Sequence, residues 1–450
     1  MSGRYQPYPE YEDSGIEWLG DIPKTWSIVR MDDLAATIKD QVTSTDLRST
    51  TVIHYSIPTV QELGIGSIEE GDTIDSSKFI VRTGDVLFSK LNPRKKTITT
   101  VARHEHMAVA STEFVVLRLT TPDQRYLQYL LHSQELSSFV CSQVESATKS
   151  HQRINPSVIS KLKFTLPSQN ERVRISNFLD HETAKIDTLI ERQQQLIQLL
   201  KEKRQAVVNR AVTKGLNPCA KMRDSDVEWL GEVPAHWEVS KFGYISMVVR
   251  GGSPRPAGDP ELFNGDYSPW VTVAEITKDD EIYLTQTETF LTKKGSDQCR
   301  IFSAGTLLIS NSGATLGVPK ILSIDANAND GVVGFENLEL DHEFSYFYLS
   351  TLTDDLRERI KQGSGQPNLN TDIVKNIPVP IPPKNEVSEI VALIQDTRKH
   401  YANLMSKANA GIELLQERRT ALISAAVTGK IDVRDWVASK ANQTNKEVAA

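Results

Sequence analysis

The residues of this chain best suited to binding chemistry are cations that gather in two short runs. Residues 82–103 contain six lysines and arginines against the single carboxylate of Asp85, and residues 149–174 contain six against Glu171. Guanidinium and ammonium groups gathered in this way are typical of surfaces that contact phosphates. Ordinary solvated surface charge would explain the same runs, so both interpretations stay open at this point.

Sequence patterns that would indicate catalysis are incomplete. Gly429-Lys430 lacks the following Ser or Thr and the earlier glycine of a Walker loop. His181-Glu182 begins like a metalloprotease helix, but Lys185 stands where the second zinc-binding histidine is needed. We therefore expect no catalytic residues and no cofactor in this chain.

Composition is that of an ordinary globular protein of several domains. The 450 residues are 39% hydrophobic and carry a net charge of −7. Cys141, Cys219 and Cys299 are odd in number and far apart, so we expect reduced packing residues and no disulfide or zinc site. His104 and His106 could hold a metal, but a solvated turn is much the better explanation. No signal peptide or apolar run of membrane length is visible, which predicts a cytoplasmic protein without membrane contact.

The chain is an internal duplication. Residues 17–26 read Glu-Trp-Leu-Gly-Asp-Ile-Pro-Lys-Thr-Trp, and residues 228–237 repeat them as Glu-Trp-Leu-Gly-Glu-Val-Pro-Ala-His-Trp, 211 positions later. Residues 199–204 and the following Ala-Val-Thr return 215 positions later, at residues 414–419 and beyond. The segments between these anchors diverge. A repeated scaffold with variable segments suits a target that also comes in two halves.

Each repeat closes with one long amphipathic helix. Apolar residues recur at spacings of three and four from Ile175 to Val207, and again from Ile390 to Leu422. Ser168 with a glutamate three residues later forms a capping-box start, and Gly215 and Gly429 form the stops. Each helix should span about 45 residues, or roughly 65 Å.

Two arrangements of these helices are possible. A long apolar seam needs a partner, and each helix has its duplicate, which predicts an antiparallel coiled coil between the two halves. Polar residues at seam positions, namely Glu182, Gln193 and Lys203, weaken the pattern and leave two separate core helices as the alternative.

The segments between the anchors read as mixed domains. Short β-rich runs at residues 112–119 and 301–310, separated by Gly, Pro and Asp turns, predict a strongly bent sheet. Residues 124–140 and 344–360 have helical patterns. The predicted fold class is α+β, with two α/β domains separated by two long helices.

The ordered combination of motifs resembles the DNA-specificity subunit of type I restriction-modification systems. The resemblance rests on the doubled Glu-Trp-Leu-Gly-x-x-Pro-x-x-Trp segment, Gly-Asp-Val-Leu at residues 84–87, Gly-Ser-Gly-Gln-Pro-Asn-Leu-Asn at 363–370, the Pro-rich run at 377–383 and the helix from 417 to 429. It implies two target-recognition domains, each reading one half of a bipartite double-stranded DNA site. It also implies that the helices dock two methyltransferase (modification) subunits and the restriction/translocase subunits, which hold S-adenosylmethionine, ATP and magnesium.

With that resemblance, the chain divides into six segments. They are a flexible N-terminal tail (1–12), target-recognition domain 1 (13–167), long helix 1 (168–217), target-recognition domain 2 (218–382), long helix 2 (383–432) and a polar C-terminal tail (433–450).

The resemblance directs attention to loops rich in Arg, Lys, Asn and Gln, because Arg reads guanine and Asn or Gln reads adenine in the major groove. Plain turns would explain each of these loops as well. Residues 147–149 also depart from the glycine-rich loop of the family. The candidate DNA-binding residues are Lys90, Asn92, Arg94, Lys95, Lys96, Lys149, His151, Gln152, Arg153, Arg250, Ser253, Arg255, Asn311, Ser312, Gln366 and Asn368.

Other interpretations remain. The repeated tryptophan segments are expected to clamp each domain to its helix, with DNA contact as the alternative. The acidic pI of 5.8 favours a rival function, a coiled-coil assembly protein whose paired domains bind another protein and not DNA. An enzyme whose signature is not visible in the sequence is a third possibility.

Overall fold

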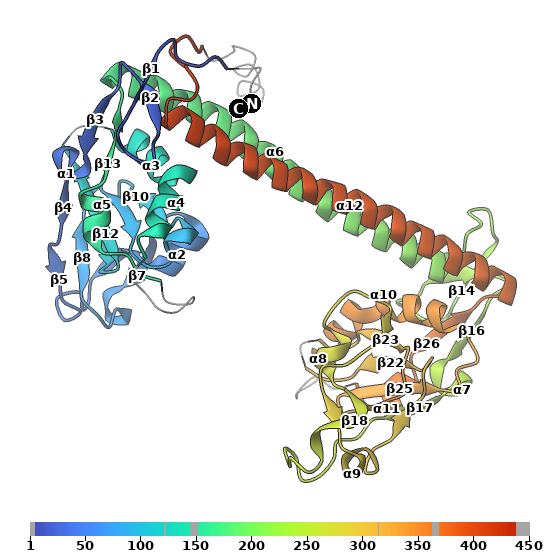
Figure 1. Ribbon diagram of the computed structural model, residues 1–450. Coiled ribbons are helices and arrows are strands. Elements are labelled where there is room, and N and C mark those ends of the chain that lie inside the picture. The colour runs from blue at the N-terminus through green and yellow to red at the C-terminus, as the bar shows by residue number, and fades with distance from the viewer. Residues whose placement is uncertain (1–4, 121–122, 145–151, 314, 362–368, 438–450) are drawn as a thin grey trace. The chain divides into compact units, whose positions relative to one another are not determined.

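The computed structural model describes residues 5–120, 123–144, 152–313, 315–361 and 369–437 (Figure 1). The chain forms two compact units, the first made of residues 1–194 and 409–450 and the second of residues 195–408. Both long helices, α6 (Gln169–Lys214) and α12 (Lys384–Val427), contribute one part to each unit.

The first unit contains two sheets joined through one core. One sheet has the strand order β10-β9-β12-β4 and is antiparallel throughout; the other has the order β5-β8-β11-β6-β7, in which β6 and β11 are parallel. The strands are β4 (Ala35–Ile38), β5 (Gln41–Val42), β6 (Thr51–Tyr55), β7 (Ser67–Glu70), β8 (Lys78–Val81), β9 (Val86–Ser89), β10 (Ile98–Thr100), β11 (Met107–Ser111) and β12 (Phe114–Leu119).

The second unit repeats this topology. Its sheets have the orders β17-β25-β22-β23-β19 and β20-β18-β24-β21, and β18 and β24 are parallel as β6 and β11 are. The units differ at the sheet edges, where β19 adds a second parallel pair with β23 and β5 is not matched. The duplication therefore extends through segments whose sequences no longer match. The strands are β17 (Met247–Arg250), β18 (Phe263–Val271), β19 (Tyr283–Leu284), β20 (Phe290–Leu291), β21 (Ile301–Phe302), β22 (Leu307–Ser310), β23 (Pro319–Leu322), β24 (Ala326–Ala328) and β25 (Val332–Glu336).

Short elements connect the sheets to the long helices. Four two-stranded pairs lie at the base of the units: β1 (Tyr11–Asp13) with β2 (Asp21–Pro23), β3 (Ser27–Arg30) with β13 (Lys163–Leu166), β14 (Met222–Asp224) with β15 (Glu232–Pro234), and β16 (Glu238–Lys241) with β26 (Pro378–Ile381). The short helices are α1 (Met31–Leu34), α2 (Ile57–Leu63), α5 (Pro156–Ser160), α7 (Phe242–Ile245), α8 (Val273–Ile276), α9 (Lys293–Ser296) and α11 (Thr371–Lys375), with the 3₁₀ turns η1 (Gly71–Thr73) and η2 (Pro93–Lys95).

Of the two helices predicted within the domains, one is continuous and one is divided. α10 (His342–Lys361) covers the predicted residues 344–360. The helix predicted at residues 124–140 is two helices, α3 (Gln124–His132) and α4 (Gln134–Ser142). Ser133 separates them because its extended backbone ends α3, while its side chain accepts a hydrogen bond from the Leu136 amide and caps α4.

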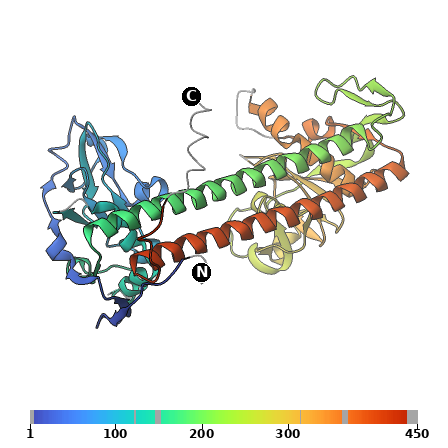
Figure 2. The same ribbon diagram turned by 90° about the horizontal axis from the view of Figure 1, so that it is seen from above.

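The long helices lie side by side within each unit (Figures 1 and 2). In the first unit, the early turns of α6 and the last turns of α12 run in opposite directions and share one core. Asp187 of α6 and Arg419 of α12 form an ion pair, with 2.8 Å between Oδ1 and Nε. The predicted antiparallel pairing is confirmed. The shared core residues are Ile175, Phe178, Leu179, Ile186, Leu422, Ile423, Ala426 and Val427.

The chain ends that were predicted to be tails are partly packed. Tyr8 is 4% exposed, and the amide of Asp432 donates to the carbonyl of Gln6 at 2.7 Å. The ring of Trp436 packs edge-on against Phe178, with 5.5 Å between the ring centroids. Aromatic side chains therefore pack parts of residues 5–12 and 433–436 against the first unit, where polar neighbours had suggested tails. Residues 438–450 lie outside the described part.

Candidate nucleic-acid interface

The first unit brings the two predicted basic runs together. Leu91 and Arg153 form an antiparallel bridge. The amide of Asn92 donates to the carbonyl of Gln152 at 2.8 Å, and the amide of Ile154 donates to the carbonyl of Lys90 at 3.0 Å. Segments about 60 positions apart in the sequence therefore form one edge, which we call the first basic edge and define as residues 90–96 with 152–154.

Three cations of the first basic edge are exposed. Arg94 and Lys95 lie in η2, and Arg153 lies on the opposing segment. Lys95 Nζ lies 3.3 Å from Gln61 Oε1, and Arg153 lies 3.0 Å from Glu113 with 55% of its side chain exposed. Exposed pairs of this kind contribute little, about 0–1 kcal/mol, so a phosphate could replace the present partner at small cost.

Two other lysines of the same edge point inward. Lys90 is buried, and its Nζ donates to the Thr112 carbonyl at 2.6 Å. Lys96 Nζ donates to the His132 carbonyl at 3.3 Å and to Gln134 Oε1 at 3.0 Å. Burial lowers the pKa of both amines. These lysines support the edge from behind, as does Asn92, which is half-buried and holds a left-handed backbone at φ 46° before η2.

The counterpart in the second unit is organised around Asp330. Its carbonyl accepts from Arg250 Nε at 2.6 Å and from Asn311 Nδ2 at 3.2 Å. Its carboxylate accepts from Ser253 Oγ at 2.7 Å. Arg250 is exposed, as is Arg255, whose amide donates to Gln298. We call residues 250–255 with 311–312 and 330 the second basic edge.

Asn311 and Lys90 have the same supporting role in the two units. Asn311 is fully buried, and its amide donates to the Gly331 carbonyl at 2.9 Å, as that of Lys90 donates to Glu113 at 2.8 Å. Each side chain then holds the carbonyl one position earlier in the same turn. Ser312, next in the chain, is half-buried.

Sequence reasoning missed Asp330. The Asn329-Asp330-Gly331 turn was the available signal, since such residues favour tight turns. Gly251 packs against this turn so closely that a Cβ there would lie 2.3 Å from the Asn329 carbonyl oxygen. The Gly-Gly pair at 251–252 is therefore explained partly by this approach. Lys149, His151, Gln366 and Asn368, also predicted from the sequence, lie outside the described residues.

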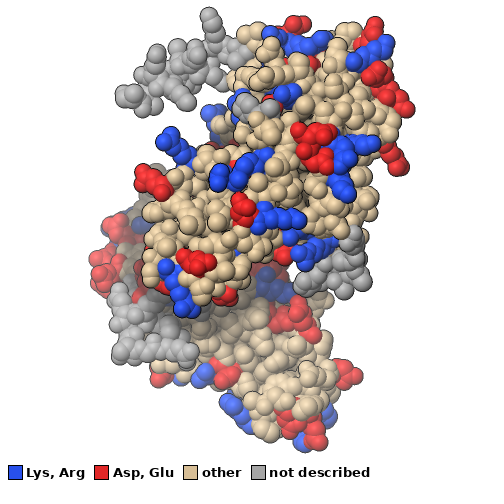
Figure 3. Space-filling model, turned by 90° about the vertical axis from the view of Figure 1, so that its left-hand side faces the viewer, with Lys and Arg blue, Asp and Glu red and all other residues tan. Residues whose placement is uncertain are grey.

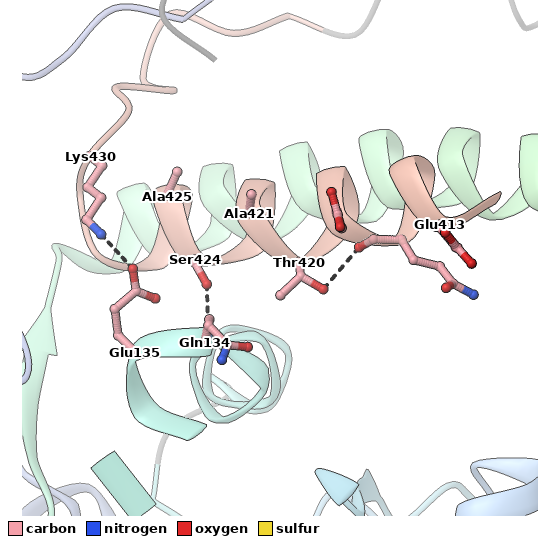
Figure 4. Close-up of a pocket in the computed structure, with 10 residues that line it drawn as sticks. Gln134, Glu135, Glu413, Thr420, Ala421, Ser424, Ala425 and Lys430 are labelled. Atoms are coloured by element: carbon pink, nitrogen blue, oxygen red, sulfur yellow. Dashed lines mark hydrogen bonds and ion pairs between the residues drawn. The ribbon is translucent and has the colours of Figure 1, made fainter. Parts of the chain in front are cut away.

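A hollow at the end of α12 has the opposite charge. It has a volume of about 820 Å³ and lies between the start of α4 and the last turns of α12 (Figure 4). Glu135, Glu413 and Glu417 line it; Glu135 is paired with Lys430 at 2.6 Å. Excess carboxylate here disfavours nucleic-acid phosphates, so the basic edges are the better candidates.

Charge on the first unit is mixed. On the face that Figure 3 turns to the viewer, lysines and arginines lie among carboxylates and form no continuous basic field. Among the described residues, no helix is long and apolar enough to cross a membrane, and no three His, Cys, Asp or Glu side chains are grouped to hold a metal ion.

The tryptophan segments clamp each domain to a long helix, as predicted. Trp26 Nε1 donates to Glu171 of α6 at 3.1 Å, and Trp237 Nε1 donates to Glu386 of α12 at 2.8 Å. Both indoles are buried, which leaves these two tryptophans no surface for DNA.

Comparison with known proteins agrees with this architecture. The family described as "Type I restriction modification DNA specificity domain" matches residues 23–199 and 234–414. The chain is 22% identical to the putative type I restriction enzyme MjaX specificity subunit of Methanocaldococcus jannaschii, over 92% of this chain and 96% of that protein. It is 22% identical to the HindI specificity subunit of Haemophilus influenzae, over 84% and 90%.

One solved structure shares the fold along most of the chain. It comes from work on complex assembly and conformational transition of the type I R-M system, has a TM-score of 0.68 and 18% identity, and covers 91% of this chain and 99% of its own. The two family matches coincide with the two structural repeats and together cover most of the sequence. The chain therefore belongs to the type I restriction-modification DNA specificity family.

Proposed function

We propose that this chain recognises a bipartite double-stranded DNA site, one half through each unit, as the specificity and scaffold subunit of a type I restriction-modification complex. The observation that supports this most directly is that each unit of the duplicated scaffold carries exposed cations beside the matching turn at Lys90 or Asn311, although the cations come from different segments in the two units. A single-site reader would need only one such edge.

Within each edge the residues divide into contacts and supports. We assign DNA contact to Arg94, Lys95 and Arg153 in the first unit and to Arg250 and Arg255 in the second, because their guanidinium and ammonium groups are exposed. Gln152, Ser253 and Ser312 are only half-buried and remain candidates for base or phosphate contact. Lys149, His151, Gln366 and Asn368 also remain candidates.

Lys90, Lys96, Asn92 and Asn311 are assigned a different role. Their polar groups are engaged within the domain or lie buried beneath the edge. Leaving a buried donor without its acceptor costs about 1–3 kcal/mol, so moving these side chains onto DNA would be expensive. We infer that they hold the contact loops in shape.

The chain itself is not an enzyme. S-adenosylmethionine, ATP and magnesium belong to the modification and restriction subunits that it assembles with. Since each repeat offers the same scaffold, we infer two modification subunits for one chain.

A domain exchange tests the division of labour. Residues 27–166 would be replaced with the corresponding segment of a relative of different specificity, and the methylated motif would be mapped by methylation-aware sequencing. The first half of the motif should change and the second should persist. A change in both halves would contradict the modular assignment. Salt distinguishes the rival assembly function, because DNA affinity should fall steeply as salt rises through counterion release.

A further inference from the structure

In the first unit, a tyrosine from the N-terminal segment fills a pocket beside the tryptophan clamp. Tyr8 OH donates to Glu171 Oε1 at 2.6 Å, and Trp26 Nε1 donates to the same oxygen. The Tyr8 ring meets Trp26 edge-on, with 5.7 Å between centroids, and the Arg434 guanidinium lies 4.9 Å from its centre. Burial beside Glu171 raises the pKa of Tyr8 far above its ordinary value, so the phenol remains a hydrogen-bond donor.

The second unit builds the same surroundings. Glu386 accepts from Trp237, as Glu171 does from Trp26. The α6 stop, Gly215, has φ 69° and packs so that a Cβ would lie 3.0 Å from the Trp237 ring. The α12 stop, Gly429, has φ 74° and packs the same way on Trp26, at 3.3 Å. Glutamate, tryptophan and left-handed glycine thus recur in one arrangement.

The tyrosine does not recur. The residue 211 positions after Tyr8 is Cys219, which is exposed and was expected to pack. In its neighbourhood lies a hollow of about 270 Å³, lined among others by Ala220, Pro234, Glu386 and Glu389. The Glu386 side chain is 30% exposed, whereas Glu171 is buried. The second unit therefore has the pocket without an occupant from this chain among the described residues.

We propose that this hollow, which we call the clamp pocket, binds a tyrosine side chain carried by an extended segment of a partner protein. The first unit supplies the precedent, since its own Tyr8 binds Glu171, the counterpart of Glu386, beside the tryptophan clamp. The volume is sufficient, because a cavity of roughly 150 Å³ already admits a benzene-sized ring. This inference concerns protein recognition and stands apart from DNA reading.

The charges that line the clamp pocket limit which aromatic side chain can bind there. Glu386 already accepts from Trp237 and His236, but a carboxylate offers about four lone-pair sites and can accept a third donor. Glu389 lies one helical turn further on and is exposed. Lys214 also lines the hollow, so the two carboxylates exceed its lysine charge by one. This excess favours a neutral phenol that donates a hydrogen bond over a phosphorylated tyrosine, which carries nearly two negative charges.

The chain's own N-terminal sequence is a suitable probe. A fluorescent peptide of residues 5–13, Tyr-Gln-Pro-Tyr-Pro-Glu-Tyr-Glu-Asp, would be titrated into the purified full-length chain and followed by anisotropy. We expect saturable binding with one peptide per chain. Replacing the central tyrosine of the peptide with Phe should weaken binding about tenfold, since a hydrogen bond to a charged group is lost. Replacement with Ala or phosphotyrosine should abolish binding.

Matched variants of the protein locate the binding. Ala220→Phe places a ring in the clamp pocket and should abolish binding, whereas Lys221→Phe, at the exposed neighbouring residue, should leave it unchanged. If the peptide instead displaced Tyr8 in the first unit, Ala220→Phe would have no effect, and the proposal would fail. Absence of binding, or equal binding of the Ala peptide, would also overturn it. Both variants should bind DNA normally, which separates this result from any failure of the proposed function.

Discussion

Asp85, in the turn before β9, and Arg118 of β12 form a two-pronged ion pair. Asp85 Oδ1 accepts from Arg118 Nε at 2.8 Å and Asp85 Oδ2 from Nη2 at 2.7 Å, while Oδ2 also accepts from the Arg82 amide at 2.8 Å. Asp85 is 1% exposed. The Gly-Asp-Val-Leu motif thus carries a carboxylate that fixes the turn before β9 to the neighbouring strand.

Asp85→Ala should destabilise the first unit. Removing one partner of a buried ion pair costs roughly 3–5 kcal/mol, and the partial exposure of Arg118 places the expected loss near the lower figure. Differential scanning calorimetry would record a lower Tm for the first unit. Asp297→Ala, which removes the exposed partner of Lys293, should change stability by less than about 1 kcal/mol. Equal effects would contradict the assignment.

Lys95→Ala and Arg153→Ala should each weaken binding to all DNA sequences and flatten the dependence of log K on log salt by about one unit per lost phosphate contact. Equilibrium titrations of the assembled complex at several salt concentrations would measure this slope. Lys24→Ala removes an equally exposed cation near the helix clamp and should leave the slope unchanged. If neither Lys95→Ala nor Arg153→Ala changed the slope, the first basic edge would not contact DNA.

Lys90→Met and Asn311→Ala should each relax one half of the recognised site. Each variant loses the hydrogen bond that holds the Thr112 or the Asp330 carbonyl, so the contact loop in front of it becomes less ordered. Mapping methylated motifs in cells that carry each variant would show degeneracy in the first half for Lys90→Met and in the second for Asn311→Ala. Loss of both halves together would indicate general unfolding and refute the local role.

Gly429→Ala should be more damaging than Gly231→Ala, although both glycines have positive φ. An alanine in the left-handed region costs roughly 1–2 kcal/mol at either position. At Gly429 the added Cβ would also lie 2.5 Å from the Pro23 ring, whereas at Gly231 it meets nothing within 4 Å. Overpacking of this kind adds about 1–3 kcal/mol. Thermal melts of the two variants would show the difference, and similar Tm values would contradict it.

Local signals in the sequence were sufficient to predict the internal repeat and the two long helices. The period of apolar residues predicted α6 and α12, and Gly215 and Gly429 end them in left-handed conformation, as such stops require. The order of the strands could not be predicted from the sequence. The partners of a strand such as β12 come from distant segments, and a period-two pattern does not identify which segments pair.

The direction of side chains could not be predicted from the sequence either. Lys95 and Lys96 are neighbours in one basic run, yet Lys95 is exposed and Lys96 is held against the end of α3. The two side chains differ in direction because the backbone at Lys96 is left-handed, with φ 48°. No pattern of residue types predicted this conformation. Asp330 was missed for a related reason. An acidic side chain argues against a phosphate-binding surface, and the sequence does not show that the backbone carbonyl of this residue orients an arginine.

The glycine stops of α6 and α12 have a consequence for how such a gene can change. Each helix ends against a tryptophan clamp, α6 against Trp237 and α12 against Trp26. The junctions at the ends of the two repeats, formed by the glycine and the tryptophan, therefore have the same structure. Recombination that replaces a half-gene between these joints would preserve both of them without compensating mutations. New combinations of half-specificities are therefore accessible in a single genetic step, while drift within one half must proceed residue by residue.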